Sequence, residues 1–244
     1  MDQDSIRQMD AGRGSEWISE GWNLFKQSPG TWIGLVVVWV LLLGLVSSAP
    51  LIGPIASNII GPVFTAGVLL GCLRAERVEA VRVEDLFVAF KTDRLGPLII
   101  LGVLSLVFVF GVVMLAAAFG FGAVAALGTG FEGGYEEMGA GVLFGVLLFM
   151  LLLLPVMMAL WFATPLVMLA GVEPVASLKL SFAACLRNIW PLTLWSLIAL
   201  LIMIVASLPL FLGLLVAGPV MMASFYRMYR DIFADAPLPE QIPL

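Results

Sequence analysis

The chain has 244 residues, of which 61% are hydrophobic and 12% charged, and its mean hydropathy is +1.09. Soluble domains contain roughly 45–50% apolar residues, so this composition excludes a water-soluble globule. The absence of histidine excludes catalytic triads with an imidazole base and the usual zinc and copper sites, and a net charge of −5 argues against nucleic acid as a partner.

Stretches without any charged residue are long enough to cross a bilayer, which takes about 20 apolar residues per helix. There are four of them, at 27–73, 95–131, 138–172 and 188–226. The first is broken at 47–50 and the last at 207–209, so each is predicted to form two spans joined by a tight turn. The second and third are predicted to form one span each, over 97–127 and 142–169. The sequence therefore predicts an all-α polytopic membrane protein with six transmembrane helices.

The basic residues indicate which ends of the spans face the cytoplasm, because short cytoplasmic segments accumulate Lys and Arg. With six spans and a cytoplasmic N-terminus, all 12 basic residues fall on the cytoplasmic side. The outer connections, at 47–50, 128–141 and 207–209, then carry none. The second connection contains Glu132, Glu136 and Glu137, for which a solvated loop is favoured over a cation site. Both termini are predicted to be cytoplasmic.

Short amphipathic stretches precede the first, third and fifth spans, at 16–26, 83–91 and 174–187. Apolar residues recur with helical spacing on one face of each stretch, and charged residues lie opposite. These helices are too short and too charged to span, so each is predicted to lie at the cytoplasmic interface with its apolar face against the acyl chains. The residues predicted to anchor them are Trp17, Trp22, Phe25, Leu86, Phe87, Phe90, Leu178 and Phe182.

A proline occurs in the second span of each pair, at Pro62, Pro165 and Pro219. Because proline frees a backbone carbonyl, these three residues are predicted to kink their spans and to place them toward the bundle interior. The unit of interfacial helix, span and return span occurs three times. It predicts pseudo-repeats over 16–75, 83–171 and 174–230 within one membrane domain, 16–230. Residues 1–15 are predicted to form a mobile tail and 231–244 a C-terminal tail.

The spans offer little chemistry, because they contain no acid or base for proteolysis, ion coupling or metal binding. We therefore expect a protein that is not an enzyme and has no catalytic, cofactor-binding or metal-binding residues. The favoured function is a structural or accessory subunit of a membrane complex, in contact with the lipid bilayer and with a membrane-protein partner or a second copy.

The alternative function is a carrier or channel for lipid or small neutral solutes. It requires a cavity with polar lining residues, and the spans offer a short set of them: Ser57, Asn58, Thr65, Thr164, Thr193, Ser196 and Ser224. Isolated hydroxyls in a helix more often bond their own backbone, which favours the accessory function.

A family resemblance is carried by two segments, 12–30 and 49–64. The matching residues are Gly12-Arg13-Gly14, Trp17-Ile18, Gly21-Trp22, Leu24-Phe25, Ser28-Pro29-Gly30, Ala49-Pro50-Leu51-Ile52-Gly53-Pro54 and Gly61-Pro62-Val63-Phe64. They resemble an uncharacterised proteobacterial family of six-span inner-membrane proteins. That family is more distantly similar to YciC-like proteins and to the membrane domain of some glycerophosphodiester phosphodiesterases. The resemblance covers residues 12–95 and implies a bacterial inner-membrane location. It implies no site residue, and no phosphodiesterase domain accompanies it.

Overall fold

The computed structural model describes residues 5–50, 52–77, 79–126 and 135–239. Within these ranges the chain is all-helical, as predicted, and contains no strand. The helices are α1 (Arg13–Phe25), α2 (Pro29–Ser47), α3 (Ile52–Glu76), α4 (Asp85–Val88), α5 (Leu95–Ala126), α6 (Tyr135–Trp161), α7 (Ala163–Met168), α8 (Pro174–Arg187), α9 (Ile189–Ser207) and α10 (Leu214–Ile232), with a 3-10 helix, Ala89–Lys91, after α4.

Five helical segments are long and apolar enough to cross a membrane, which confirms the prediction of a polytopic membrane protein. They are Pro29–Ser47, Ile52–Glu76, Leu95–Phe119, Leu143–Met168 and Ile189–Ser207. The sixth expected span, α10, is not among them because its last turns carry Arg227, Arg230 and Asp231. Its uncharged part, 214–226, is only about 20 Å long at 1.5 Å per residue. The count of six spans stays a prediction.

The two tight turns expected from sequence separate helices as predicted. Helix α2 ends at Ser47 and α3 begins at Ile52, while α9 ends at Ser207 and α10 begins at Leu214. The second turn holds Leu210 and Phe211 in left-handed conformations, with φ of 49° and 64°. Of the outer connection expected at 128–141, residues 128–134, including Glu132, lie outside the described residues, and Tyr135 already begins α6.

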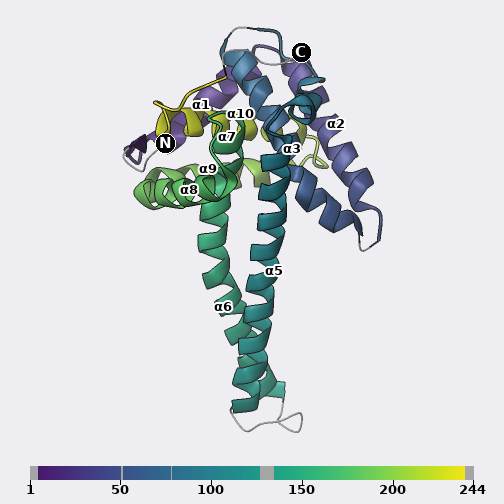
Figure 1. Cartoon of the computed structure of the whole chain (residues 1–244), viewed down its shortest axis with the longest axis vertical. Coiled ribbons are helices and arrows are strands. Elements are labelled where there is room, and N and C mark those ends of the chain that lie inside the picture. Colours follow the sequence, from purple (N-terminus) through teal and green to yellow (C-terminus); the bar gives the residue numbers. More distant parts are fainter. Residues whose placement is uncertain (1–4, 51, 78, 127–134, 240–244) are drawn as a thin grey trace.

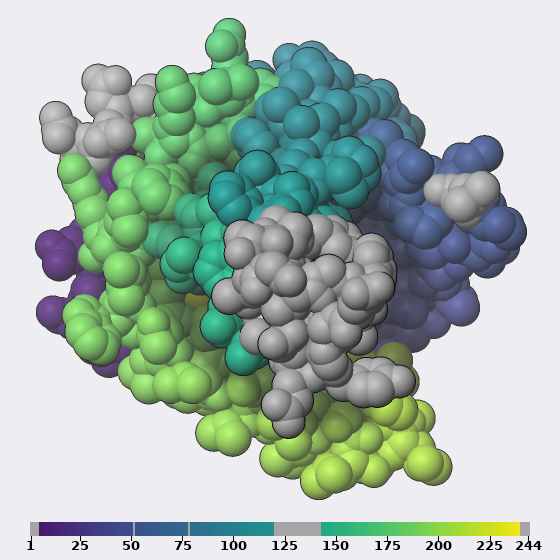
Figure 2. Space-filling model, turned by 90° about the horizontal axis from the view of Figure 1, so that it is seen from below, coloured from purple at the N-terminus to yellow at the C-terminus, as the bar shows by residue number. Residues whose placement is uncertain are grey.

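A long hairpin of α5 and α6 projects beyond the other helices, and α8 lies across its base (Figure 1). The 32 residues of α5 correspond to about 48 Å, which exceeds the ~30 Å hydrocarbon core of a bilayer. Seen from the tip of this hairpin, blue segments of α2 and α3 lie on the right, and green to yellow segments of α8 to α10 lie to the left and below (Figure 2). The described chain begins and ends in the half of the molecule away from this tip (Figure 1).

Several pairs of helices approach each other backbone to backbone at a glycine, among them α5 with α3 and α1 with α10. A Cβ at Gly102 of α5 would lie 2.3 Å from the Ile59 carbonyl oxygen of α3, and one at Gly21 of α1 would lie 2.6 Å from the Ser224 nitrogen of α10. Only glycine permits such close contact, in which dispersion and weak hydrogen bonds accumulate. These contacts fix where α5 meets α3 and where α1 meets α10.

The segment expected to be a mobile N-terminal tail is bound to the helices where it is described. Ile6 is buried, and the Arg7 N–H donates to the Ile232 carbonyl at 2.9 Å. Asn188, which is buried at the junction of α8 and α9, accepts from the Met9 N–H at 2.8 Å and donates to the Arg7 carbonyl at 3.0 Å. A buried side-chain amide needs such hydrogen-bond partners, and the backbone at 6–9 supplies them. The start of the C-terminal tail is likewise packed, with Phe233 buried.

Candidate functional site

The three amphipathic stretches are helical, but half of their predicted anchor residues face protein rather than solvent or lipid. Trp17, Phe25, Leu86 and Leu178 are all buried. Trp17 is fully buried and its Nε1–H donates to Asp231 at 2.7 Å, which ties α1 to the end of α10. Periodicity identifies an apolar helix face. It does not show whether that face packs on another helix, as Trp17 does on α10, or contacts acyl chains, because both faces have the same composition.

The other predicted anchors remain available at the surface. Trp22, Phe87 and Phe90 are 44%, 40% and 38% exposed, and Phe182 is partly buried. Phe87 and Phe90 also make edge contacts with Phe64 of α3, at ring distances of 6.2 and 5.3 Å. Membrane anchoring through these residues stays a prediction.

Of the three prolines predicted to kink their spans, only Pro165 lies near a helix break. Helices α3 and α10 continue through Pro62 and Pro219, whereas the chain breaks between α6 and α7 at Phe162, three residues before Pro165. Pro165 and Pro219 are buried, and Pro62 is partly buried. The ring of a proline clashes with the carbonyl four residues earlier, which here belongs to Trp161, the last residue of α6.

Hydroxyl groups bond the backbone near two of these prolines, one from a neighbouring helix and one from the same helix, as expected for helices in lipid. Ser181 of α8 accepts from the Phe162 N–H at 2.9 Å and donates to the Met158 carbonyl at 2.7 Å. In α3, the Thr65 hydroxyl donates to the Gly61 carbonyl at 3.0 Å. The broken region of α6 and α7 is therefore held against α8 by a specific side chain.

A cavity of about 330 Å³ opens beside Pro62, between α3, α5 and the break of α6 and α7. We call it the polar cavity, because five of its lining residues carry a hydroxyl or amide. Its lining is Ser57, Asn58, Gly61, Pro62, Thr65, Leu101, Ser105, Leu160 and Thr164. Four of these, Ser57, Asn58, Thr65 and Thr164, belong to the polar set expected from sequence. Ser105 of α5 was not in that set.

A second cavity, of about 390 Å³, adjoins the first. We call it the apolar cavity; it is lined by Thr65, Val68, Leu69, Met157, Leu160, Trp161, Thr164, Trp195, Met221, Met222 and Phe225, from α3, α6, α7, α9 and α10. Thr65, Leu160 and Thr164 line both cavities. The ring of Trp161 meets those of Trp195 and Phe225 edge to face, at 6.0 and 5.9 Å. Each volume falls within the roughly 300–1,000 Å³ of small-molecule sites.

The remaining polar residues of the expected set do not line either cavity. Thr193 donates to the Ile189 carbonyl of its own helix at 2.7 Å, as isolated hydroxyls commonly do. Ser224 accepts from the Trp195 Nε1–H at 2.6 Å, and Ser196 is exposed on α9.

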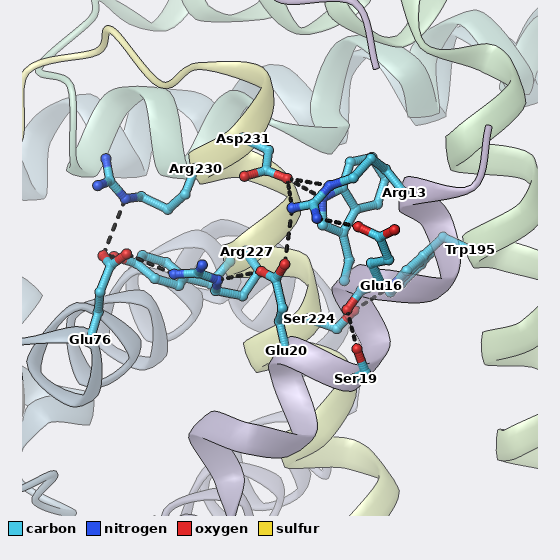
Figure 3. Close-up of polar contacts among 12 residues, drawn as sticks. Arg13, Glu16, Ser19, Glu20, Glu76, Trp195, Ser224, Arg227, Arg230 and Asp231 are labelled. Carbon is cyan, nitrogen blue, oxygen red and sulfur yellow. Dashed lines mark hydrogen bonds and ion pairs between the residues drawn. The ribbon is translucent and has the colours of Figure 1, made fainter. Parts of the chain in front are cut away.

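Beyond the apolar cavity, the last turns of α10 carry an ion-pair cluster that sequence reasoning missed (Figure 3). We call it the ionic cluster; its members are Arg13, Glu16, Glu20, Glu76, Arg227, Arg230 and Asp231. Arg227 bridges two helices, with Nε 2.7 Å from Glu20 of α1 and Nη1 2.8 Å from Glu76 of α3. Arg13 of α1 contacts both Glu20 and Asp231.

The ionic cluster joins α1 and α3 to the C-terminal turns of α10, just after the cavity-lining residue Phe225. In the sequence, its arginines served only to indicate the cytoplasmic ends of the spans. The sequence feature that could have revealed the cluster is the spacing of Arg227, Arg230 and Asp231, which share one helical face at i, i+3 and i+4. Their partners lie about 150 to 218 residues away in sequence, which no local pattern reveals.

A second ion pair is almost fully enclosed. The Arg74 Nε lies 2.9 Å from the Asp85 Oδ1, and their side chains are 7% and 2% exposed. Asp85 also accepts from the Arg82 N–H at 3.0 Å. Burial raises the pKa of the Asp85 carboxyl, although the Arg82 N–H and the charge of Arg74 act in the opposite direction. The pair holds α4 against the end of α3.

Comparison with known proteins agrees with a membrane location. The chain is 28% identical to a probable inner membrane protein of Burkholderia thailandensis, in an alignment that covers 93% of each chain. No protein-family model and no solved structure matches the chain. Together with the five apolar helices, this similarity supports the prediction of a multi-pass inner-membrane protein.

Proposed function

We propose that this protein is a six-span inner-membrane protein that binds lipid or small neutral solutes in the joined polar and apolar cavities and carries them across the bilayer. The observation behind the proposal is that hydroxyl and amide side chains meet apolar ones at Thr65 and Thr164, beside Pro62 in α3 and the break between α6 and α7. Among the residues that the structure describes, none of those that line either cavity is charged. Binding sites between helices of a bundle commonly combine an apolar wall with a few polar groups in this way.

The proposed topology has α10 as the sixth span, both termini in the cytoplasm, and three pseudo-repeats begun by α1, α4 and α8. The link to YciC-like proteins belongs to the same proposal. Support comes from the placement of all 12 basic residues on one side of such a topology. It also comes from the position of the described chain ends, away from the tip of α5 and α6 (Figure 1).

Cysteine labelling tests this topology in cells. Both natural cysteines, Cys72 and Cys185, are buried, and burial raises the pKa of the Cys185 thiol to about 12, so background labelling is low. A membrane-impermeant maleimide is expected to label Gly133→Cys from the periplasm, and Gln241→Cys only after permeabilisation. Labelling of Gln241→Cys in intact cells, or failure to label Gly133→Cys there, contradicts the proposed topology.

Transport is tested with the purified chain in liposomes. Transbilayer movement of a fluorescent lipid, or uptake of glycerol, is expected to exceed that of protein-free liposomes. Thr65→Phe, which fills the junction of the two cavities, is expected to lower the rate about tenfold, equivalent to ~1.4 kcal/mol. Thr193→Phe is the matched control, because Thr193 is exposed on α9 and lines neither cavity. Equal rates for the two variants contradict transport through the cavities.

The accessory role is the second proposed function, and it is supported by the projecting hairpin of α5 and α6. Large apolar side chains, among them Val107, Phe110, Met114 and Leu151, are exposed along both of its helices. This surface suits lipid, a partner helix or a second copy. Recovery of a larger complex after crosslinking in cells, with no flux in liposomes, favours this role over transport.

A further inference from the structure

We propose that the joined cavities bind a neutral amphiphile, namely a lipid with hydrocarbon at one end and uncharged oxygens, including a hydroxyl, at the other. Monoacylglycerol has this chemistry. The inference rests on the proposed transport function and narrows its substrate class. It follows from three features of the lining: the composition of the apolar cavity, the hydrogen-bonding groups of the polar cavity, and the absence of charge.

The apolar cavity is suited to a flexible hydrocarbon chain. Three methionines, Met157, Met221 and Met222, line it together with three aromatic rings. Methionine is unbranched and polarizable, so it adapts to chains of variable shape. The rings of Trp161, Trp195 and Phe225 supply rigid apolar area at little entropic cost.

The polar cavity offers both donors and acceptors. Hydroxyls of Ser57, Thr65, Ser105 and Thr164 and the amide of Asn58 line it. The Thr65 hydroxyl donates to the Gly61 carbonyl and that of Ser57 is hydrogen-bonded to Ser47, so these two serve mainly as acceptors, while hydroxyl and amide groups in general are able to donate and to accept. Because residue 62 is proline, the Asn58 carbonyl receives no N–H from the next helical turn. Such a carbonyl accepts from a ligand hydroxyl, while the side-chain donors suit ester or hydroxyl oxygens.

An unsatisfied donor belongs to the same lining. The Trp161 Nε1–H is buried and has no acceptor within the described part of the chain. Burying such a donor without a partner is unfavourable. A ligand oxygen in the apolar cavity that reached this donor would supply the missing acceptor.

The lining discriminates against ionised ligands. Asp, Glu, Lys and Arg are missing from the lining of the two cavities over the described part of the chain. The arginines of α10 are engaged by carboxylates of the ionic cluster. A phosphate or carboxylate bound there would therefore gain no counter-charge from the lining.

The order of lining residues along α3 also orients the ligand. Ser57, Asn58 and Thr65 of α3 line the polar cavity, whereas Thr65, Val68 and Leu69, toward the α3 C-terminus, line the apolar cavity. The polar end of the ligand therefore lies toward the N-terminal half of α3, which faces the outer leaflet in the proposed topology. The hydrocarbon then extends past Thr65 and Thr164 toward the middle of the bundle.

Photolabelling of the full chain in nanodiscs tests this inference. The probes are a diazirine-bearing monoacylglycerol and a lysophosphatidic acid with the same acyl chain and the same diazirine position. The neutral probe is expected to label peptides that contain 157–164 or 221–225, saturably, and about tenfold more strongly than the anionic probe. Asn58→Leu with Thr164→Val is expected to weaken neutral labelling about tenfold, equivalent to ~1.4 kcal/mol. Thr193→Val, the control, is expected to leave it unchanged.

The outcomes separate this inference from the proposed function. Equal labelling by the two probes, or unchanged labelling of the Asn58→Leu, Thr164→Val variant, overturns the neutral-amphiphile inference even when liposome flux is observed. Absence of both saturable labelling and flux overturns the inference together with the transport function. Labelling confined to α2 or to the exposed faces of α5 and α6 indicates bulk lipid and also overturns the inference.

Discussion

Replacement of Gly102 by valine is expected to abolish the docking of α5 on α3 and to leave little folded protein. A Cβ at this position would lie 2.3 Å from the Ile59 carbonyl oxygen and 2.7 Å from the Ile59 Cα. Both are backbone atoms, which cannot rotate away as a side chain does. Overpacking of a core typically costs about 1–3 kcal/mol, and we expect the upper end or more here because two helices must separate. The measurement is the yield of monodisperse protein in detergent and its thermal unfolding midpoint.

Gly111 provides the matched control on the same helix. Nothing lies within 4 Å of a Cβ built at Gly111, so Gly111→Val is expected to retain the yield and midpoint of the unmodified chain. Gly102→Ala is expected to fall between the two. A Gly102→Val protein as stable as Gly111→Val would show that α5 does not cross α3 at this point.

Replacement of Asp85 by alanine is expected to destabilise the protein by about 3–5 kcal/mol, because it removes the buried member of the ion pair with the Arg74 guanidinium. Arg74 is 7% exposed and lies 2.9 Å from Asp85. Glu79, 3.3 Å from Arg74 Nη1 and 46% exposed, compensates only in part. The Arg82 N–H also loses its acceptor. Chemical unfolding in mixed micelles measures the loss.

Two further variants show whether burial of the charge is the cause. Arg74→Leu with Asp85→Leu is expected to recover much of the stability, since removing both charges removes the uncompensated one. Asp93→Ala breaks an exposed pair, in which Asp93 is 84% exposed and lies 3.7 Å from Arg94, and is expected to change stability by less than about 1 kcal/mol. If Asp85→Ala were as mild as Asp93→Ala, the enclosed pair would contribute nothing to the fold.

Local sequence was sufficient for the helices themselves. The break at 47–50, the helix Pro174–Arg187 and the apolar lengths of α2, α3, α5 and α9 follow from charge, proline and hydropathy, which act within a few turns. The set of polar residues that includes Asn58, Thr65 and Thr164 was also visible in the sequence, because polar side chains are rare in apolar spans. The sequence did not show which of these residues line a cavity and which bond the backbone of their own helix.

Two features required contacts between distant segments. Trp17 was expected at the lipid interface, but α10 covers it and Asp231 accepts its hydrogen bond. Periodicity cannot distinguish a helix face covered by protein from one covered by acyl chains, since both covers are apolar. The tail at 6–9 was expected to be mobile because its own sequence is polar; its backbone instead binds Asn188, more than 170 residues away.

Composition and hydropathy alone determined that this chain is helical, lies in a membrane and carries its basic residues outside the apolar spans, because each of these properties depends on the solvent that a segment of about 20 residues prefers. Tertiary structure alone decided that Arg227 bridges Glu20 and Glu76, that Gly102 touches Ile59, and that Thr65 and Thr164 meet at the junction of two cavities. These depend on which helices become neighbours, and the packing of complementary shapes and charges, rather than hydropathy, selects those neighbours.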